Sequence, residues 1–527
     1  MTTQADALDL SECDKEPIHI PGSIQPHGVL LVLEPATRCI RQAAGNTQAL
    51  LGKEITQLLG EPVDTVVGPQ ITDALSSLAS DSQEPLYVGA LSVPGKPETT
   101  LDITRHYRDG LLILELEPSS KPIASVAQTI GEIRKVVAGW EECQTLQELF
   151  DLSCQSIRKL TGFDRVMTYQ FLHDDTGVVV AEDKLESLDA LVNHHYPASD
   201  IPKQARALYL KNPIRLIADV EYEPAPLLPA HDPTSQSTLD MSECILRSVS
   251  PIHIQYLKNL NVAASMSVSL VVNGRLWGLV SCHHTSARFV PYEVRETCRL
   301  LGRILGQLIR AHEEAAASAQ AQRLTTARER LLRNLATIDS IERGVEEHLG
   351  DMRALVQADG AALIRHGKLS QTGLAPTDDQ TRELVQWLLD TSQSSTFATA
   401  SLVEHHAPAK AYVAKASGLL AVVVAHSGPF VLLWFRAEHL ETINWAGNPH
   451  KPIEAGSKPG QLTPRKSFED WKELVRNKAK PWAEPEVECA RLFGRAIQDI
   501  RTQHFLNEMN LQSQKALAVR QALSRGD

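Results

Sequence analysis

One cysteine lies in a segment that cannot be helical. Cys13 belongs to the stretch DLSECDKEPIHIPGSIQPHGVL, where three prolines keep the backbone extended. Its neighbours Glu12 and Asp14 disfavour the thiolate, so the thiol is not reactive by itself. Two interpretations stay open, an ordinary surface thiol or a nucleophile held beside a bound electrophile.

A second candidate is the triplet Cys282-His283-His284, which could bind a metal or form a Cys-His nucleophile. The apolar stretch before it predicts a strand, and alternation along a strand sends Cys282 and His284 to one face and His283 to the other. We therefore expect no shared catalytic or metal site here. The eight cysteines are scattered without CxxC spacing, which argues against a disulfide framework and a zinc site.

The segment from His194 to Val220, HHYPASDIPKQARALYLKNPIRLIADV, gathers polar groups around prolines. Asp200 precedes Ile-Pro, where an aspartate forms a turn or caps a helix, and it could also offer an acceptor to a bound group. Arg215 and the later Arg247 suit carboxylates, whereas an arginine outside any motif is more often paired with a surface acid.

Composition limits the class of protein. A chain of 527 residues predicts about three to four domains, and 43% hydrophobic with 22% charged residues is typical of a globular protein. The net charge of -12 argues against nucleic acid as a partner. The N-terminus lacks the features of a signal peptide, and no apolar run approaches a membrane span, so we expect a cytoplasmic protein without membrane association.

Hydrophobic periodicity divides the chain into strand-rich domains separated by helices. The expected elements are α/β strands between Val29 and Leu116, a linker at 117–125, a helical stretch at 126–160, strands at 264–272 and 275–284, and a third strand-rich domain from about Ala361 with strands in LLAVVVAHS and PFVLLWFRA.

One long helix is expected between the second and third domains. No proline occurs from Tyr292 to Ala375, and a helix over residues 292–345 would be about 80 Å long. The pentapeptide RLLGR at 299–303 recurs as RLFGR at 491–495, so we interpret the two domains as related duplicates. An apolar stripe after Pro485 predicts a coiled-coil dimer contact. Its residues are Leu492, Phe493, Ile497 and Ile500.

The core Pro-Ala-Ser-Asp-Ile-Pro at 197–202 resembles the chromophore-binding domain of phytochromes, and SPIHIQYLKNLNVAASMSVSLVV, LWGLVSCHH and PRKSF follow in the family's order. The resemblance covers essentially the whole chain and implies a bacterial, biliverdin-binding phytochrome photosensory module. The implied fold class is α/β (α+β), with three PAS/GAF-like domains, antiparallel sheets, long connecting helices and an N-terminal figure-eight knot. The expected domains are an N-terminal arm with PAS domain at 1–125, a GAF domain at 126–315 and a PHY domain at 316–527, with a tongue at about 443–482.

The resemblance implies a red/far-red photoreceptor that photoconverts by double-bond isomerisation at the terminal ring of a bilin, a linear tetrapyrrole. Biliverdin is expected as the cofactor, in a thioether to Cys13, because the plant-type attachment cysteine would stand at Ile252. No catalytic residue and no metal site are expected.

By resemblance, the propionate carboxylates contact Arg215, Arg247, Ser265, Ser267 and His253, the ring nitrogens face Asp200 and His253, and the rotating ring lies among Tyr169, Tyr196, Tyr256 and His283. The remaining expected chromophore-binding residues are Ile201, Pro202, Tyr209 and Ser250.

The tongue residues Arg465 and Ser467 stand in PRKSF, and the resemblance implies that Arg465 pairs with Asp200. Phe468, Trp471, Leu474 and Val475 recur at helical spacing, which favours a helix, whereas the family also folds this segment as a hairpin. The resemblance further implies a red-absorbing resting state, in which the tongue is a hairpin, because family members that rest in this form have a histidine at the position of His194. Without the resemblance, this segment would be interpreted as an ordinary surface loop.

The expected partners are a second copy, through the long helices, and a kinase, another effector domain or a response regulator that receives the signal. Two rival functions remain, a non-photoactive GAF-type sensor of a small ligand and a redox or metalloenzyme that uses Cys282. An absorption spectrum after addition of biliverdin discriminates among them.

Overall fold

The computed structural model describes residues 16–523, except 78–81, 94–98, 120–125, 337, 339, 392–393, 426–427, 448–453, 456–461 and 464–469. The predictions for Cys13, Arg465, Ser467 and Phe468 fall outside the described residues. The chain forms two compact units, one of Met1–His312 with Asn444–Lys472 and one of Glu313–Ile443 with Glu473–Asp527.

The first domain is built on a five-stranded antiparallel sheet in the order β3-β2-β6-β5-β4. Its apolar face is covered by short helices and contains Leu31, Ile103 and Leu114 in its core. The elements are β2 (Val29–Leu33), β3 (Ile40–Gly45), α1 (Thr47–Leu51), α2 (Ile55–Leu58), α3 (Asp64–Ser77), β4 (Leu86–Ser92), β5 (Thr100–Arg108) and β6 (Leu111–Pro118). The expected linker at 117–125 begins later than predicted, because Glu117 and Pro118 still belong to β6.

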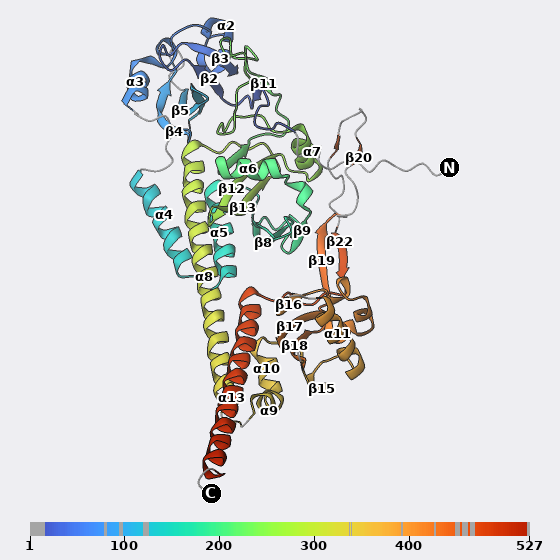
Figure 1. Ribbon diagram of the computed structural model, residues 1–527. Coiled ribbons are helices and arrows are strands. Elements are labelled where there is room, and N and C mark those ends of the chain that lie inside the picture. Colours follow the sequence, from blue (N-terminus) through green and yellow to red (C-terminus); the bar gives the residue numbers. More distant parts are fainter. Residues whose placement is uncertain are drawn as a thin grey trace, which may run out of the picture. The chain divides into compact units, whose positions relative to one another are not determined.

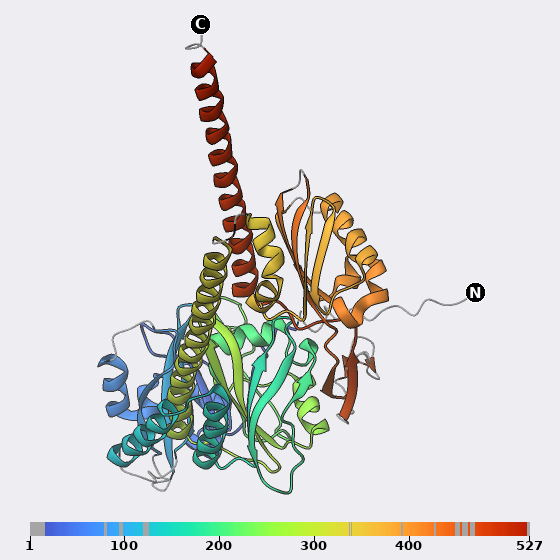
Figure 2. The same ribbon diagram turned by 90° about the horizontal axis from the view of Figure 1, so that it is seen from below.

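The second domain carries the sheet order β10-β12-β13-β7-β8-β9, to which β19 and β22 are added. The helices α4, α5 and α8 lie along one face (Figures 1 and 2), where Phe163, Val268 and Leu305 are buried. Its helices are α4 (Val126–Glu141), α5 (Leu146–Thr161), η2 (Ala198–Asp200), α6 (Lys203–Lys211), α7 (Pro251–Asn259) and α8 (Tyr292–Ala336). Its strands are β7 (Arg165–Phe171), β8 (Gly177–Lys184), β9 (His194–Tyr196), β10 (Ile214–Ile217), β12 (Ala264–Val272) and β13 (Arg275–His284), and the short pair β1 (Ser23–Ile24) and β11 (Ala225–Pro226) joins it to the N-terminal segment.

The third domain is a five-stranded antiparallel sheet in the order β15-β14-β18-β17-β16. Figure 2 shows α11 on one face and α9, α10 and α13 on the other. The elements are α9 (Ile341–Glu347), α10 (Leu349–Leu355), β14 (Gly360–Arg365), β15 (Lys368–Gly373), α11 (Asp378–Thr391), β16 (Thr396–Thr399), η3 (Leu402–Glu404), η4 (Ala407–Tyr412), α12 (Val413–Ala416), β17 (Gly418–Ala425), β18 (Phe430–Arg436) and α13 (Glu484–Leu523).

The tongue forms strands. Its elements are β19 (Glu441–Ala446), β20 (Glu454–Ala455), β21 (Leu462–Thr463) and β22 (Asp470–Val475). Trp471, Leu474 and Val475 thus lie in a strand, although their spacing favours a helix. Strand β22 is the neighbour of β19 in the sheet, and β19 in turn pairs with β9 at Asn444 and Trp445. Strand pairing therefore outweighs the local helical preference.

Two expectations about helices hold only in part. The long helix ends at Ala336 rather than near 345, because Ser340 caps a new helix that buries Ile341 and Val345 in the core of the third domain. The stripe on α13 is not a free dimer contact, since Phe493 and Ile497 are fully buried in that same core. Exposed apolar residues follow further along α13, at Phe505, Leu506, Met509, Leu511 and Leu517.

Helices of the described chain are all too short or too polar to cross a bilayer.

Candidate functional site

The second domain contains a cavity of about 350 Å³ on the face of its sheet opposite α5 and α8. Alternation builds its floor, because Ser265 pairs with His283 and Ser267 with Ser281 across β12 and β13. Ser281 in turn pairs with Met167 of β7. These side chains share one face and line the cavity.

Helix α7 and the Pro-Ala-Ser-Asp-Ile-Pro segment form another wall. Ser250 and Pro251 begin α7, because the Ser250 hydroxyl accepts from the Ile252 amide and proline fits the first helical turn. His253 and Tyr256 stack with ring centroids 5.9 Å apart, and the Tyr256 hydroxyl donates to Asp200 Oδ2 at 3.1 Å. The helix thus orients two aromatic side chains and a carboxylate toward the same space.

Two of the three histidines that line the cavity, His253 and His283, are neutral near pH 7. Burial, followed by the charge of Arg215, lowers the pKa of His253 to about 4. Burial, followed by Arg165 and His253, lowers the pKa of His283 to about 3. The Nε2 atom of His283 lies 3.2 Å from the Ser281 hydroxyl. Neutral imidazoles can donate through one nitrogen and accept through the other.

Arg215 brings a positive charge to the cavity from β10. Its guanidinium donates to the carbonyl oxygens of Ile245, at 3.3 Å, and Arg247. Burial, with the neighbouring charge of Arg247, lowers the pKa of Arg215. Within the described part of the chain, no carboxylate lies within ion-pair distance of Arg215. The arrangement therefore suits a carboxylate ligand.

An aromatic group closes one end of the cavity. The rings of Tyr169 and Tyr196 lie 5.8 Å apart, and those of Tyr169 and Phe171 lie 5.3 Å apart. A Cβ atom at Gly177 would lie 1.8 Å from the Tyr169 hydroxyl oxygen, so glycine leaves the space that this ring occupies. Ala446 of the tongue packs into the same cluster.

Most of the predicted binding residues lie together around this cavity. They are Tyr169, Tyr196, Asp200, Ile201, Tyr209, Arg215, His253, Tyr256, Ser265, Ser267 and His283. Pro202, Arg247 and Ser250 do not line it. Pro202 is the N-cap residue of α6, Arg247 donates to the Ile18 carbonyl, and the Ser250 hydroxyl donates to Glu16 at 2.8 Å.

Sequence reasoning missed several lining residues, including Met167, Leu279 and Ser281. Period-two alternation from Tyr169 and His283 would have found all three. Asn261 and Val262 also line the cavity, and no local sequence signal indicates them because they follow α7 in an irregular turn.

Cys282 faces away from the cavity, as alternation predicts, but His284 lines the cavity together with His283, so the prediction that His284 shares the face of Cys282 is wrong. Cys282 is fully buried with Cys154 and Cys298 in the core beneath the helices, and burial raises the pKa of its thiol. Among the described residues, no group of three or more histidine, cysteine, aspartate or glutamate side chains is arranged to hold a metal ion.

Family models match most of the chain: a PAS fold at residues 13–119, a GAF domain at 145–311 and a phytochrome region at 324–505. The chain is 37% identical over 487 residues to cyanobacterial phytochrome B of Nostoc, covering 92% of this chain and 65% of that protein. It is 33% identical over 519 residues to a bacteriophytochrome of Pseudomonas aeruginosa, covering 98% of this chain and 70% of that protein. The chain thus spans about two thirds of the length of such relatives.

Solved structures of phytochromes have the same fold as this chain. The crystal structure of bacteriophytochrome RpBphP3 from R. palustris superposes with a TM-score of 0.82 at 35% identity, covering 94% of this chain and 99% of that one. The Stigmatella aurantiaca phytochrome photosensory core module superposes with a TM-score of 0.79 at 38% identity, covering 95% and 99%. The chain therefore belongs to the phytochrome family, as a photosensory core module with PAS, GAF and PHY domains.

Proposed function

We propose that the chain is a red/far-red photoreceptor whose GAF cavity holds biliverdin, attached through a thioether to Cys13. Phytochromes bind bilin chromophores, and the residues around the cavity fit such a molecule. The observation that carries the proposal is Arg215, a guanidinium at the cavity wall that is bound by backbone carbonyls and has no carboxylate partner among the described residues. A bilin propionate would supply the anion.

The other residues that line the cavity contact different parts of the bilin. Ser265, Ser267 and His253 donate to propionate oxygens. The backbone carbonyl of Asp200 accepts from the ring nitrogens, and His253 helps to hold a bridging water there. Tyr169, Tyr196 and Tyr256 surround the terminal ring without fixing it, and His283 donates to its carbonyl. A bilin bound there would absorb light and rotate about the double bond next to its terminal ring.

The attachment proposal is supported by the chain just after Cys13. Glu16 accepts from Ser250, and the Ile18 carbonyl accepts from Arg247, so the start of the described chain lies against the GAF domain beside α7. Cys13 is three positions before Glu16, a reach of about 10 Å. The figure-eight knot and the pairing of Arg465 with Asp200 stay part of the proposal.

The tongue supports a red-absorbing resting state. His194, the residue on which the resting-state prediction depends, pairs with Asn444 of β19, and the described residues of the tongue include the strands β19, β20, β21 and β22. After light absorption, Asp200 and Arg465 separate and the tongue rearranges, a bistable step that needs only a few kcal/mol of bias. The long helices carry the change to a partner, and exposed apolar residues from Phe505 to Leu517 support a dimer contact on α13.

The test is reconstitution of the full chain with biliverdin, followed by red illumination and denaturation. We expect a red-absorbing band that converts reversibly to a far-red band, with pigment retained after denaturation. Cys13→Ala should bind biliverdin but release it on denaturation, whereas Cys39→Ala, which changes another accessible cysteine, should retain it.

Three outcomes would contradict parts of the proposal. Binding without any light-induced spectral change would favour a non-photoactive small-ligand sensor. Covalent pigment in Cys13→Ala would place the attachment on another cysteine. A far-red band that accumulates in darkness would reverse the assignment of the resting state.

A further inference from the structure

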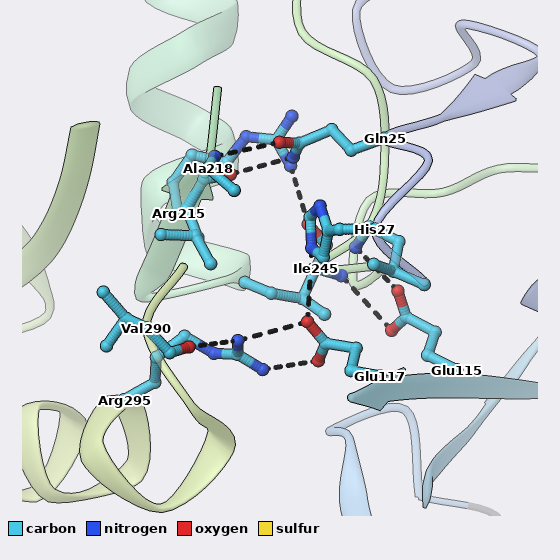
Figure 3. A network of polar contacts seen from close by, with 11 residues as sticks. Gln25, His27, Glu115, Glu117, Arg215, Ala218, Ile245, Val290 and Arg295 are labelled. Atoms are coloured by element: carbon cyan, nitrogen blue, oxygen red, sulfur yellow. Dashed lines mark hydrogen bonds and ion pairs between the residues drawn. The ribbon is translucent and has the colours of Figure 1, made fainter. Parts of the chain in front are cut away.

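Two carboxylates at the end of strand β6 are buried where the PAS domain meets the GAF domain (Figure 3). Glu115 and Glu117 are 1% and 2% exposed, and alternation places both on the same face of the strand. A buried carboxylate is stable only with hydrogen-bond or ion-pair partners. The partners of Glu115 and Glu117 therefore show which segments these two side chains hold.

Glu117 is held by the side chains of Arg295 and His27. Arg295 of α8 donates to both of its oxygens, at 3.1 Å to Oε1, and His27 Nε2 lies 3.4 Å from the same oxygen. Burial opposes ionisation, but Arg295 and His27 outweigh it and lower the pKa of Glu117 to about 2. Near neutral pH, Glu117 is therefore ionised and forms a structural ion pair with Arg295.

Glu115 is held by backbone amides. Its oxygens accept from the amides of Ile245, at 3.2 Å, and Leu246, at 2.8 Å. Burial outweighs these bonds and raises the pKa of Glu115 to about 7.

The charged and titratable groups near Glu115 come from several elements. They are Glu117 on β6, Arg295 on α8, Arg215 on β10, and Cys244 and Arg247 in the loop before α7. Burial raises the pKa of Cys244 further above neutral, and the arginines remain charged. Two histidines also lie beside this set, His27 in contact with Glu117 and His106 in contact with Cys244. Glu115 is the carboxylate of the set whose pKa is raised to about 7.

The segment that Glu115 holds also holds the cavity arginine. The amides of Ile245 and Leu246 point to Glu115, while the carbonyls of Ile245 and Arg247 accept from the Arg215 guanidinium. One short segment thus links a carboxylate of the PAS domain to a side chain that lines the cavity.

A second PAS contact fixes the strand that carries Arg215. Gln25 is 1% exposed, and its side chain donates to the Leu216 carbonyl at 2.9 Å and accepts from the Ala218 amide at 3.3 Å. Figure 3 shows Gln25, Glu115 and Arg215 in one network of polar contacts. With β10 fixed by Gln25, the direction of the guanidinium depends on the carbonyls of segment 245–247.

We propose that Glu115 is a positioning residue: through segment 245–247 it aims Arg215 into the cavity, so that the affinity for a carboxylate-bearing bilin depends on the ionisation of a PAS-domain side chain. The proposal rests on the proposed function for the identity of the ligand. Ionised Glu115 accepts from both amides. Protonated Glu115 has a hydroxyl in place of one acceptor, which releases part of the segment and the carbonyls that orient Arg215.

The apoprotein of the full chain gives the first test. Hydrogen exchange of the Ile245 and Leu246 amides, corrected for intrinsic rates, and the Nε–H resonance of Arg215 are measured between pH 6 and 8. We expect protection to rise roughly two- to tenfold through pH 7 in the wild type, the size of one hydrogen bond, and the Arg215 signal to shift in parallel. Glu115→Gln should remove both changes. Asp102→Asn, at a buried PAS carboxylate that accepts from Tyr87, is the control and should retain them.

The second test is biliverdin affinity over the same range of pH. The wild type should bind roughly two- to tenfold more tightly at pH 8 than at pH 6, and Glu115→Gln should bind independently of pH. An unchanged pH dependence in Glu115→Gln would overturn the proposal, as would amide protection that changes while the Arg215 signal stays fixed. If the wild type binds no biliverdin at any pH, the proposed function fails, while the apoprotein measurements still decide whether Glu115 positions Arg215.

Discussion

The GAF and PHY sheets have the same strand order but differ on one face. This face lines a cavity in the GAF domain and is covered by an apolar core in the PHY domain. The order β10-β12-β13-β7-β8 of the GAF sheet matches β16-β17-β18-β14-β15 of the PHY sheet. The repeated pentapeptide fixes the correspondence. A Cβ atom at Gly302 would lie 2.6 Å from Val268, and one at Gly494 would lie 2.4 Å from Val422, so each glycine allows its helix to approach the same strand. This agreement supports the interpretation of the domains as duplicates.

On the helix-covered face the two sheets are alike. Met266, Val268 and Val280 of the GAF domain correspond by strand register to Leu420, Val422 and Leu432 of the PHY domain. All six side chains are buried in apolar cores. Packing against a helix requires apolar side chains in both domains.

The opposite face differs at a few positions. The GAF residues Ser267, Ser281 and His283 line the cavity. By register, the PHY domain has Ala421, Leu433 and Phe435 in their places, all fully buried in a core that includes Leu384 and Leu388 of α11. Small polar side chains leave space for a ligand, whereas large apolar ones fill it, and the strand order permits both.

Leu433→Ala should have the largest effect on stability. The residue is 0% exposed, and removing a buried leucine side chain leaves a cavity that typically costs about 2–5 kcal/mol. Ser281→Ala, at the corresponding GAF position, should change the free energy of unfolding by less than about 1 kcal/mol because that face is already open. Urea unfolding of the apoprotein measures both. Equal losses in the two variants would remove the distinction between a filled and an open face.

Ser281→Leu makes the GAF face resemble the PHY face. The added side chain should occupy ligand space and weaken biliverdin binding at least about tenfold, equivalent to about 1.4 kcal/mol, without lowering apoprotein stability by more than about 1 kcal/mol. Absorbance titration measures the affinity, with the exposed Ser286→Leu as control. If Ser281→Leu binds biliverdin like the wild type, the ligand does not occupy this part of the cavity.

His283→Phe gives the GAF domain the residue that the PHY domain has at Phe435. It should have the smallest effect of the three, seen in how the free energy of unfolding depends on pH. The folded-state pKa of His283 is lowered from 6.5 to about 3, so the unfolded chain binds more protons between these values. The stability contributed by neutral His283 is complete above pH 6.5 and falls by about 1 kcal/mol per pH unit below it.

Urea unfolding of the apoprotein at pH 7.5 and 5.5 tests this expectation. The loss of stability at pH 5.5 should be smaller in His283→Phe than in the wild type, although His253 continues to contribute because its pKa is also lowered. An identical loss in both proteins would show that His283 is not desolvated in the folded state.

Local patterns in the sequence were sufficient for the strands and for much of the site. Residues 264–272 and 275–284 are β12 and β13, since their alternation and apolar content depend on neighbours along the chain. The same alternation separated Cys282 from His283. The resemblance through residues 197–202 identified residues that the structure brings together around one cavity, including Asp200 and His253.

Predictions from the sequence were wrong where contacts between distant residues determine the structure of a segment or its burial. The periodicity after Pro485 marks an apolar face on α13 but not its partner, which is the sheet of the same domain. The helical spacing in the tongue is overridden by the pairing of β22, which contains Trp471 and Leu474, with its neighbour β19 in the sheet. Helical and strand periodicities describe one element at a time, whereas burial and pairing depend on what packs against it.

Only the tertiary structure showed that Glu115 acts near the cavity. It lies 131 residues before Leu246, whose amide donates a hydrogen bond to it. Nothing in the sequence LELEP distinguishes Glu115 from Glu117. The sequence by itself determined which segments become strands and which faces are apolar, because these depend on residue type and local spacing. The fold decided which of two neighbouring carboxylates meets an arginine and which meets backbone amides, and the opposite pKa shifts of Glu115 and Glu117 follow from that difference in partners.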